Sequence, residues 1–531
     1  MLRLSQDSGR GSNVSVIGSV TSLSAIHREV PRSTAAFADT CQHVEREVSE
    51  RAGFAEREAQ RWHLPCSVIT RPSVSRDGFS QVESMPLSPT TLYTEEAHEI
   101  ICEAYTYGYP LVLTDVIRQL MTSAGKGGVH RSPLNQFVHA RAISENVAFG
   151  HYGADADMLH SIAWLNVAKE PTVLSVPDVH QRHYTMHLVD GWMIAFAALG
   201  ARTTGNRKGH FAIVGPRWSG DIPTGIRVLE SPTAIVWLIG RTQTHGAKDY
   251  SSVHEIQNQH GLTPLSLWGH TEAPEQPAPA MRDVALKATP SEQVARMDAS
   301  TFFGRLNTLM SDNLPRTADA PALKRFSAVG VGPGRPFELR DDPVLARSVD
   351  GSVRTALARI VVEATKPSGR TPNGWEIQPN NVGSNETDYM WRAVVAFLNP
   401  GARPVEDGLS LHTSVDAEGV RLTGTHRYVL RFAKGHTPPV NGFWSVAVHN
   451  SRRAFVQNEI DRHAISSTDA LKPHADGSVT LHIHHERPDK HSTSTWLPTP
   501  KDQFTLTMQL HWPQAEIVDR TWTPPSVERI S

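Results

Sequence analysis

The sequence has few cysteines and little net charge, and it lacks long apolar runs. Its 531 residues include only three cysteines, Cys41, Cys66 and Cys102. Their odd number and their spacing exclude a disulfide framework and a thiolate metal site. The formal net charge of −2 gives no attraction to nucleic acid or to an anionic membrane. No apolar run approaches the roughly 20 residues that a membrane-spanning helix needs.

The signatures of several large enzyme classes are missing as well. The sequence has no G-x-S-x-G elbow, no P-loop, no H-E-x-x-H and no dinucleotide fingerprint between a strand and a helix. The Gly-rich run at 329–336 contains prolines and lacks the Lys-Ser/Thr that would follow a phosphate loop, so it predicts a turn. We therefore expect no nucleotide cofactor.

The first 85 residues have the composition of an appendage. They are rich in Ser, Arg and Val, and only the stretch 41–62 has the pattern of a polar helix. No apolar segment follows a basic start, so a secretory signal peptide is not expected. We predict a poorly ordered extension over 1–85 and a cytoplasmic location. Mitochondrial targeting ranks second, because the first 35 residues are rich in Arg and Ser, and Met85 is an alternative start.

Two helices are expected directly after this extension. Thr94 is placed to cap the first helix, because two glutamates follow in its first turn, where carboxylates meet the positive helix end. Gly108 and Pro110 are expected to end this helix. A second helix is expected over 111–121.

Short runs of β-branched and aromatic residues dominate two regions, 172–240 and the chain after 405. In the first region these runs alternate with Gly, Pro, Asn and Asp turns. Many short strands at such spacing are typical of an antiparallel sandwich or barrel. In the second region, segments such as RYVLRF and FTLTMQLHW alternate apolar and polar residues, which predicts half-buried strands.

The middle of the chain is predicted to be helical. Thr289 and Glu292 form a capping box with a proline at the first helical position, and helical stretches follow at 353–365 and 387–398. The predicted fold class is mainly β with helical insertions (α+β), with two antiparallel β-sandwich or jelly-roll-like domains and a helical middle. The expected boundaries are 1–85 for the extension, 86–271 for the N-terminal β domain with its leading helices, 272–404 for the proline-rich linker and helical middle, and 405–531 for the C-terminal β-sandwich domain.

Two long segments resemble a known pair of domains. Between 135 and 265 the chain reads NQFVHARAIS, GADADMLHSIAWLNV, KEPTVLSVPD and GRTQTHGAKDYSSVHEIQNQHGLTPL, and this order resembles the family called domain of unknown function 1254. From NGFWSVAVHN to TWTPP it resembles the usual companion, domain of unknown function 1214. The resemblance covers about 93–525. It implies two β-sandwich-like domains with intervening helices, and it implies no particular activity.

The first candidate site is the acidic run Asp155-Ala156-Asp157, with His160 three residues later. The similar family has a pattern close to Asn-Ala-Asp-Thr-Leu-Tyr-Ser here, so Asp157 matches it, whereas Asp155 and His160 depart. On a strand the imidazole would face away from both acids, and on a helical turn it would pair with Asp157. Carboxylates beside an imidazole suit acid–base chemistry or a metal. A short acid also commonly anchors a local turn.

Arginine supplies the next two candidates. Arg241 ends an apolar run, and a buried guanidinium needs a carboxylate or phosphate partner. It forms either a structural pair with the acidic run or a clamp for substrate. The resemblance adds Arg462, beside His463, and a fourth candidate, Trp496. This tryptophan is either a packing pin or the wall of an apolar pocket.

Histidine is unusually frequent, with 27 residues in the chain. On a strand, His482 and His484 project from one face at a spacing that suits zinc or copper. The alternative is that they lie on the wet face of an antiparallel sheet. Five histidines stand where the similar family tends to carry tyrosine: His160, His449, His463, His482 and His511.

We predict an enzyme that acts on a small organic molecule, by hydrolysis or elimination, in a cleft between the two β domains. The chemistry would be acid–base or metal-assisted. The alternative is a non-catalytic protein that binds a small ligand or associates with the cell envelope. The candidate residues are Asp157, His160, Arg241 and Arg462 for catalysis, Asp155, Trp164, Gln243, His463 and Trp496 for substrate binding, and His482 and His484 for a metal. The expected partner is a small-molecule ligand, without nucleic acid and without a membrane span, and the sequence is compatible with a transition metal and with a homo-oligomer.

A shortened protein that begins at Met85 is expected to be soluble and to melt at the temperature of the full chain. The reason is that the extension lacks the periodic apolar residues that would pack on a core. Calorimetry of both proteins measures this. A melting temperature lower by more than a few degrees in the shorter protein would show that the extension packs on the folded part.

Overall fold

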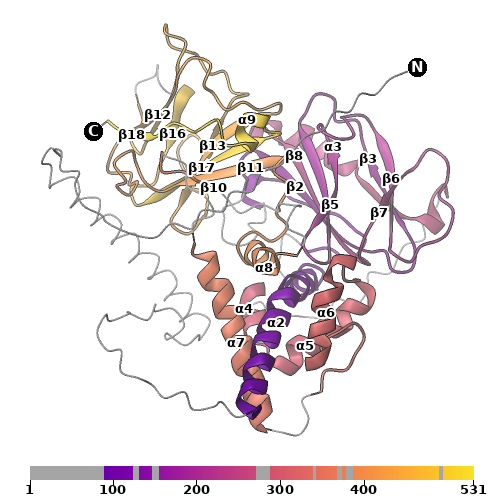
Figure 1. The fold of residues 1–531 in the computed structure, drawn as a ribbon. Helices are drawn as coiled ribbons and strands as arrows, with labels where there is room; N and C mark the ends of the chain where they lie inside the picture. The colour runs from indigo at the N-terminus through magenta and orange to yellow at the C-terminus, as the bar shows by residue number, and fades with distance from the viewer. Residues whose placement is uncertain are drawn as a thin grey trace, which may run out of the picture. The chain divides into compact units, whose positions relative to one another are not determined.

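The computed structural model describes residues 89–123, 131–145, 155–270, 288–338, 343–366, 373–377, 387–488 and 494–530. The predicted extension over 1–85 and the proline-rich linker over 272–280 lie outside the described residues. Within the described part, the fold is mainly β with helical insertions, which confirms the predicted class (Figure 1). Four open sheets form two β-rich domains.

The N-terminal β domain contains two sheets, here called the first and second sheets. The five strands of the first sheet are all antiparallel, and the second sheet contains one parallel pair, β6 with β7. In spatial order the first sheet consists of β1 (Val138–His139), β2 (Met158–Asn166), β8 (Ile235–Gln243), β4 (Tyr184–Asp190) and β5 (Ala195–Gly200). The second consists of β7 (Arg227–Glu230), β6 (Gly209–Val214), β3 (Thr172–Val176) and β9 (Gly261–Pro264), with α3 (Tyr250–Asn258) before β9.

The first sheet is buried on both faces, which explains why its central strands are almost continuously apolar. On β2, Ala163 and Leu165 point toward the second sheet, whereas Ile162 and Trp164 point toward the helices. Strand β8 alternates in the same way, and Trp164 stacks on Trp237 with ring centroids 4.7 Å apart. Each large apolar side chain buried in this way contributes about 1.5–3 kcal/mol.

The helices gather on one side of the strands (Figure 1) and share one core with the first sheet. Their bounds are α2 (Pro89–Met121), α4 (Pro290–Ala295), α5 (Ala299–Asp312), α6 (Ala320–Phe326), α7 (Pro343–Ala364) and α8 (Tyr389–Leu398). The predicted capping box is present: Thr289 Oγ1 accepts from Glu292 N, and the Glu292 carboxylate accepts from Thr289 N. A separate helix, α5, follows α4, because Asp298 caps a new start at Ala299.

The predicted break at Gly108 and Pro110 is wrong, because α2 continues through both residues. Propensity is overridden by packing here, since this part of α2 is buried among α5, α7 and α8. Gly108 serves close packing: a Cβ at this position would lie 2.4 Å from Leu306 Cδ2 on α5. Thr94 lies inside the helix and therefore does not begin it.

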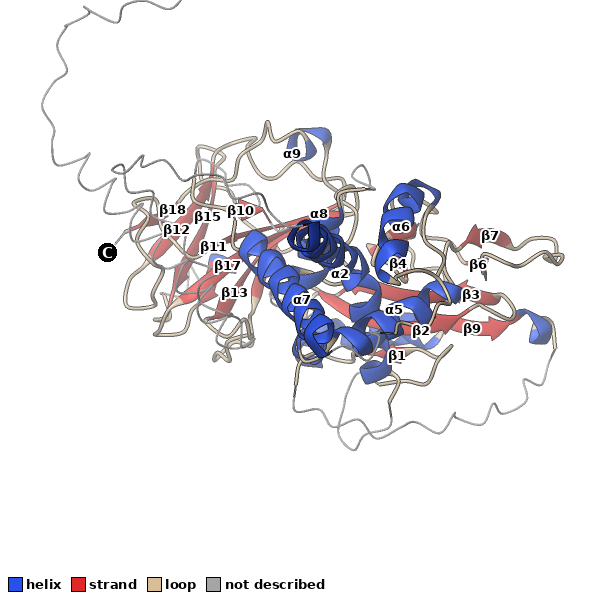
Figure 2. Ribbon diagram, turned by 60° about the horizontal axis from the view of Figure 1, so that its bottom comes forward, coloured by secondary structure: helices blue, strands red, loops and turns tan. Residues whose placement is uncertain are grey.

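The C-terminal β domain also contains two sheets, the third and fourth sheets (Figure 2). All pairs are antiparallel except β15 with β16. In spatial order the third sheet consists of β10 (Glu376–Ile377), β11 (Gly408–Thr413), β17 (Phe504–His511), β13 (Trp444–Asn450) and β14 (Ala464–Ser466). The fourth consists of β16 (Trp496–Pro498), β15 (Val479–His484), β12 (Tyr428–Phe432) and β18 (Val527–Arg529), and a short helix α9 (Ala515–Val518) follows β17.

The third sheet has one apolar face and one polar face, and both are buried. Leu411, Val446 and Met508 belong to the core shared with the fourth sheet. The residues between such positions are polar, and in an open antiparallel sheet they would normally face water. Instead they are at most 8% exposed; they are Ser410, His412, Ser445, His449, Thr507, Gln509 and His511. A buried polar strand face needs polar partners, so it marks the place to look for a site.

No helix in the described part of the chain is long and apolar enough to cross a bilayer.

Gly108→Ala is expected to lower the free energy of unfolding by about 1–3 kcal/mol, because the added methyl overpacks against the buried Leu306. Gly304→Ala is the matched control: it also lies in a helix, and nothing lies within 4 Å of its added Cβ. That variant is expected to be about 0.5–1 kcal/mol more stable. Urea unfolding measures both, and equal stabilisation by the two substitutions would contradict the packing role of Gly108.

Candidate functional site

Three neighbouring strands of the first sheet, β2, β8 and β4, carry polar residues at the same end of the strands, here called the edge. Asp157 directly precedes β2, Gln243 ends β8, and His183 directly precedes β4. Gln243 N donates to His183 O at 3.0 Å, and Thr244 N donates to Asp157 O at 2.9 Å. The strand pairing β2-β8-β4 therefore brings a carboxylate and an imidazole from separate parts of the sequence to one edge.

From this edge a first chain of hydrogen-bonded side chains runs into the C-terminal β domain. Its members, in order, are His160, Asp155, Arg241, His187, Asp407 and Arg202. Asp155 Oδ2 accepts from His160 Nε2 and from Arg241 Nε, each at 3.0 Å. Arg241 Nη1 reaches His187 Nδ1 at 3.5 Å, and His187 Nε2 lies 3.1 Å from Asp407 Oδ2. Arg202 donates to both Asp407 oxygens, at 2.6 and 3.0 Å.

A second chain runs along the polar face of the third sheet. Its members, in order, are Ser410, Gln509, Arg403, His511, Asp157 and Ser445. Gln509 Oε1 accepts from Ser410 Oγ and from Arg403 Nη2, each at 2.6 Å. Arg403 Nη1 lies 3.5 Å from His511 Nδ1, and His511 Nε2 lies 3.5 Å from Asp157 Oδ2. The Ser445 hydroxyl donates to the same Asp157 oxygen.

Each chain takes one carboxylate from the other β domain. Asp407, directly before β11, completes the chain built on the first sheet, and Asp157, directly before β2, completes the chain built on the third sheet. His187 is fully buried, and Asp407 is 3% exposed. Ions buried this deeply are tolerated only with several hydrogen-bonded partners. We call the region that holds both chains the junction.

The proton position on two junction histidines follows from their neighbours. A guanidinium only donates, so His187 Nδ1, which faces Arg241, must accept, and the neutral ring carries its proton on Nε2 toward Asp407. The same reasoning for Arg403 puts the proton of His511 on Nε2, toward Asp157. The His187 ring is therefore fixed between a donor and a carboxylate, whereas His511 Nε2 lies 3.5 Å from Asp157 without making a hydrogen bond.

Burial lowers the pKa of three junction histidines, His160, His183 and His187, and so keeps them neutral. Burial lowers the pKa of His187, and Asp407 opposes this only in part. Burial also lowers the pKa of His160 against the opposing effect of Asp155. Burial, together with the nearby His511, lowers the pKa of His183 to about 3. Burial raises the pKa of Asp155, but the hydrogen bond from His160 and the charge of Arg241 outweigh it and hold this pKa well below its usual range.

Three buried polar atoms at the junction have no hydrogen-bond partner among the described residues: Asp157 Oδ1, His183 Nε2 and His511 Nε2. A buried donor or acceptor left in this state costs about 1–3 kcal/mol. Phe443 stacks on His511 with ring centroids 4.3 Å apart, and His183 meets His511 edge to face at 5.6 Å. We call these three unpartnered atoms the open atoms of the junction, and they lie around the rings of His183, Phe443 and His511.

The structure brings several sequence-predicted residues together. Asp155, His160 and Arg241 share the first chain, Asp157 belongs to the second chain, and Gln243 accepts from His183 N at 3.4 Å. The suggested pairing of His160 with Asp157 is replaced by a pair with Asp155, because the chain bends before β2 instead of forming a helical turn. Arg241 forms an ion pair with Asp155, as in the structural alternative considered for it.

Other predicted residues lie elsewhere. Trp164 packs in the core on the helical side of the first sheet and donates to Met121 Sδ at 3.4 Å. Arg462 donates to the backbone oxygen of Trp496 at 3.0 Å, so it links the region before β14 to β16. The buried Trp496 donates to His484 O, and His463 pairs with Asp461 at 3.2 Å. The contacts of Arg462 and Trp496 hold the C-terminal domain together.

The metal candidates His482 and His484 both lie on β15. His484 Nδ1 lies 2.6 Å from the backbone oxygen of Glu486. Among the residues that the structure describes, no group of three His, Cys, Asp or Glu side chains is arranged to hold a metal ion.

Sequence reasoning missed most of the second chain. Gln509 and His511 alternate with apolar residues on β17, as Ser445 does on β13, and such alternation normally indicates a face toward water. The position of these strands in the middle of the third sheet was the missing information. His183, Arg403 and Asp407 carry no local signal, because they gain their roles only from contacts across hundreds of residues.

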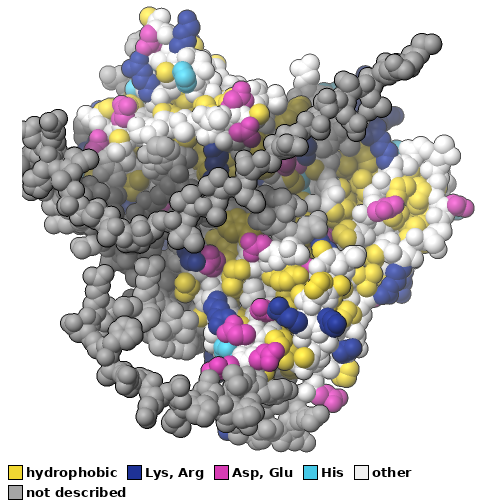
Figure 3. Space-filling view, viewed as in Figure 1, with side chains coloured by type: hydrophobic (Ala, Val, Ile, Leu, Met, Phe, Trp, Pro, Cys, Tyr) yellow, Lys and Arg dark blue, Asp and Glu magenta, His cyan; other side chains and the backbone are white. Residues whose placement is uncertain are grey.

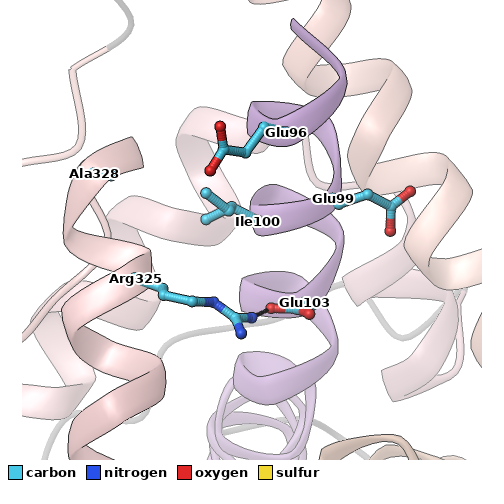
Figure 4. Close-up of a pocket in the computed structure, with 6 residues that line it drawn as sticks. All are labelled: Glu96, Glu99, Ile100, Glu103, Arg325 and Ala328. Carbon is cyan, nitrogen blue, oxygen red and sulfur yellow. Dashed lines mark ion pairs between the residues drawn. The ribbon is translucent and has the colours of Figure 1, made fainter. Parts of the chain in front are cut away.

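A hollow of about 420 Å³ on the helical side offers a contrast (Figure 4). It is lined by residues of α2 together with Arg325 and Ala328. Arg325 pairs with Glu103, and Glu99 is held by Arg359. Figure 3 shows acidic and basic side chains interspersed over the helices on this face. The hollow contains none of the sequence-predicted site residues, and two of its three glutamates are paired with arginines.

The fold and the junction define a mainly β protein in which two β domains share buried hydrogen-bond chains. Residues 134–264 match the family model described as protein of unknown function (DUF1254), and residues 407–515 match that described as protein of unknown function (DUF1214). The two matches confirm the resemblance of this chain to the paired family. The first match contains Asp157, Arg241 and His187, and the second contains Asp407, Ser445 and His511.

One solved structure supports the same fold. The crystal structure of the VPA0106 protein from Vibrio parahaemolyticus is similar with a TM-score of 0.64 and 21% identity, covering 82% of this chain and 100% of that chain. This identity shows the fold alone. An uncharacterised protein from Burkholderia cenocepacia matches with a TM-score of 0.40 and 11% identity, covering 92% of this chain and 98% of its own. The comparison with curated proteins gave no match.

The buried neutral histidines predict a stability that falls with acidification. Their folded pKa values lie below the unfolded value of about 6.5, so below that pH the unfolded chain binds more protons. Each histidine that stays neutral should remove about 1.4 kcal/mol per pH unit, from pH 6.5 down to its folded pKa. Denaturant unfolding at pH 7.5, 6.5 and 5.5 measures this loss. The lowered pKa of Asp155 extends the loss below pH 4, because its stabilising charge disappears only in stronger acid.

Two variants test the source of this dependence. His183→Gln should reduce the slope, because it removes one buried neutral ring. His180→Gln is the matched control, because that side chain is 87% exposed. A slope that both variants leave unchanged would contradict the role of the junction.

Proposed function

We propose that the protein is an enzyme that acts on a small organic molecule at the junction, with Asp157 as the group that transfers a proton. One observation supports this most directly. Asp157 reaches from the first sheet to Ser445 and His511 of the third sheet through one oxygen, and its other oxygen has no partner among the described residues. A carboxylate held through one oxygen and open at the other has the geometry of a general base.

The two chains would fix this carboxylate in place. Arg403 sets the tautomer of His511, so that the Nε2 proton points toward Asp157. His160 and Arg241 hold Asp155, and we assign them positioning roles instead of direct proton transfer. Groups held in advance by such partners do not need to reorganise during a reaction. The backbone strain at Trp512, a bulky residue with φ of 52° directly after His511, fits a functional position.

Hydrolysis and elimination both fit a buried carboxylate base. In hydrolysis, Asp157 would take a proton from the attacking water and return it to the leaving group. In elimination, it would take a proton from a carbon beside a carbonyl group, and the leaving group would depart from the next carbon with that proton. The metal-assisted form of the prediction gains no support from the described histidines.

The alternative proposal is a binding protein without catalysis. The ligand would bind to the same open atoms. The difference from an enzyme is that the ligand would be released without a chemical change. The cytoplasmic location expected from the sequence and a homo-oligomeric state belong to the proposal as well, and cell fractionation and light scattering test them.

Asp157→Asn is expected to lower turnover by about 10²–10⁴-fold, the usual contribution of a general base. A screen of esters, lactones, amides and β-hydroxy carbonyl compounds against the full chain would identify the substrate. His180→Gln is the control, because that side chain is 87% exposed and belongs to neither chain. Equal turnover in the wild type and the Asp157 variant would exclude the assigned role, and binding without turnover would favour the alternative.

A further inference from the structure

The open atoms of the junction present a donor next to an acceptor. His511 Nδ1 faces Arg403, so His511 Nε2 carries the hydrogen and is a donor. The carboxylate of Asp157 can only accept. His511 Nε2 lies 3.5 Å from Asp157 Oδ2, and Asp157 Oδ1 is the neighbouring acceptor. A ligand that satisfies both must carry an acceptor and a donor side by side.

The charges of the junction already cancel. The two chains contain three guanidinium groups, on Arg202, Arg241 and Arg403, and three carboxylates, on Asp155, Asp157 and Asp407. Burial lowers the pKa of His160 and of His187, so these two rings add no charge. A charged ligand would therefore leave a net charge in a place with little water, which is unfavourable. A neutral ligand avoids this cost.

A flat apolar wall lies beside the polar pair. The ring of Phe443 lies against that of His511 with an interplanar angle of 17°. Gly442 keeps the backbone close to this group, because a Cβ there would lie 2.7 Å from His511 O and 3.2 Å from His183 Nδ1. His183 Nε2 adds a third open polar atom. Few polar groups beside an aromatic surface are typical of small-molecule sites.

We propose that the junction binds a neutral ligand through a carboxamide or lactam group. The carbonyl oxygen of the ligand accepts from His511 Nε2, its N–H donates to Asp157 Oδ1, and its flat apolar part lies against Phe443. This assignment rests on the proposed site and names its ligand class. It does not depend on whether the bound ligand reacts.

The test uses matched neutral and anionic probes on the full chain at pH 7.5. The pairs are benzamide with benzoate and 2-pyrrolidinone with acetate, and binding is measured by ligand-observed saturation-transfer NMR. The neutral member of each pair is expected to bind at least about tenfold more tightly, because a tenfold change corresponds to only about 1.4 kcal/mol. Equal binding of both members, preference for the anion, or no binding of either amide would overturn the proposal.

A single substitution should reverse this preference. In Asp157→Asn the side-chain oxygen can keep the Ser445 hydrogen bond, so the amide nitrogen takes the place of Oδ1 and donates. The site then has two donors and one negative charge fewer, and it should prefer benzoate to benzamide. His183→Phe is the second variant if the first does not fold. It should weaken benzamide binding without reversing the preference, and His180→Gln, which replaces an exposed side chain outside both chains, should change neither.

The outcomes separate this inference from the proposed function. If the protein binds amides, and Asp157→Asn reverses the preference, but no substrate is turned over, the proposed enzymatic function is wrong and the ligand class is supported. If turnover depends on Asp157 but the protein does not prefer amides, the enzymatic function is supported and the ligand class is wrong. A high-resolution crystal structure soaked in benzamide gives an independent result. Finding an ordered water at Asp157 Oδ1 and His511 Nε2 that benzamide does not displace would also overturn the proposal.

Discussion

The exchange of carboxylates between the two β domains is the interaction on which the rest of the structure depends. Asp157 leaves the first sheet to meet Ser445 and His511, and Asp407 leaves the third sheet to meet His187 and Arg202. Removing one member of such a buried group would leave a guanidinium or an imidazole without compensation, which is costly. The two domains therefore hold each other through charges that neither could bury alone.

This exchange explains why the third sheet can bury both of its faces. Its apolar face packs on the fourth sheet, as in any β-sandwich. Its other face is polar, and it is buried with partners from Asp157, from Arg403 and from neighbouring strands of the same sheet. The satisfaction is incomplete at Asp157, His183 and His511. Incomplete polar networks are expensive, and a protein that keeps one commonly uses it.

The sequence predicted the fold better than the site, for a physical reason. Strands and caps depend on near neighbours, so the run TVLSV gave β3 and the Thr289 capping box gave α4. The break at Pro110 failed because packing of α2 overrides local propensity. Asp155, Asp157 and Arg241 could be selected as polar residues beside apolar strands. Their partners could not, since Ser445 lies 288 positions from Asp157, and its strand pattern resembles that of an ordinary solvent-facing sheet.

The reciprocal carboxylates also constrain how such a protein can change over generations. A substitution at position 157 alters the surroundings of positions 445 and 511, which lie in the other domain, and a substitution at 407 does the same for 187 and 202. Neither domain can drift on its own without exposing the other to an uncompensated buried charge. Recombination that replaced one domain by a distant counterpart would break both chains at once. The two domains are therefore inherited as one unit, although a long stretch of sequence separates them.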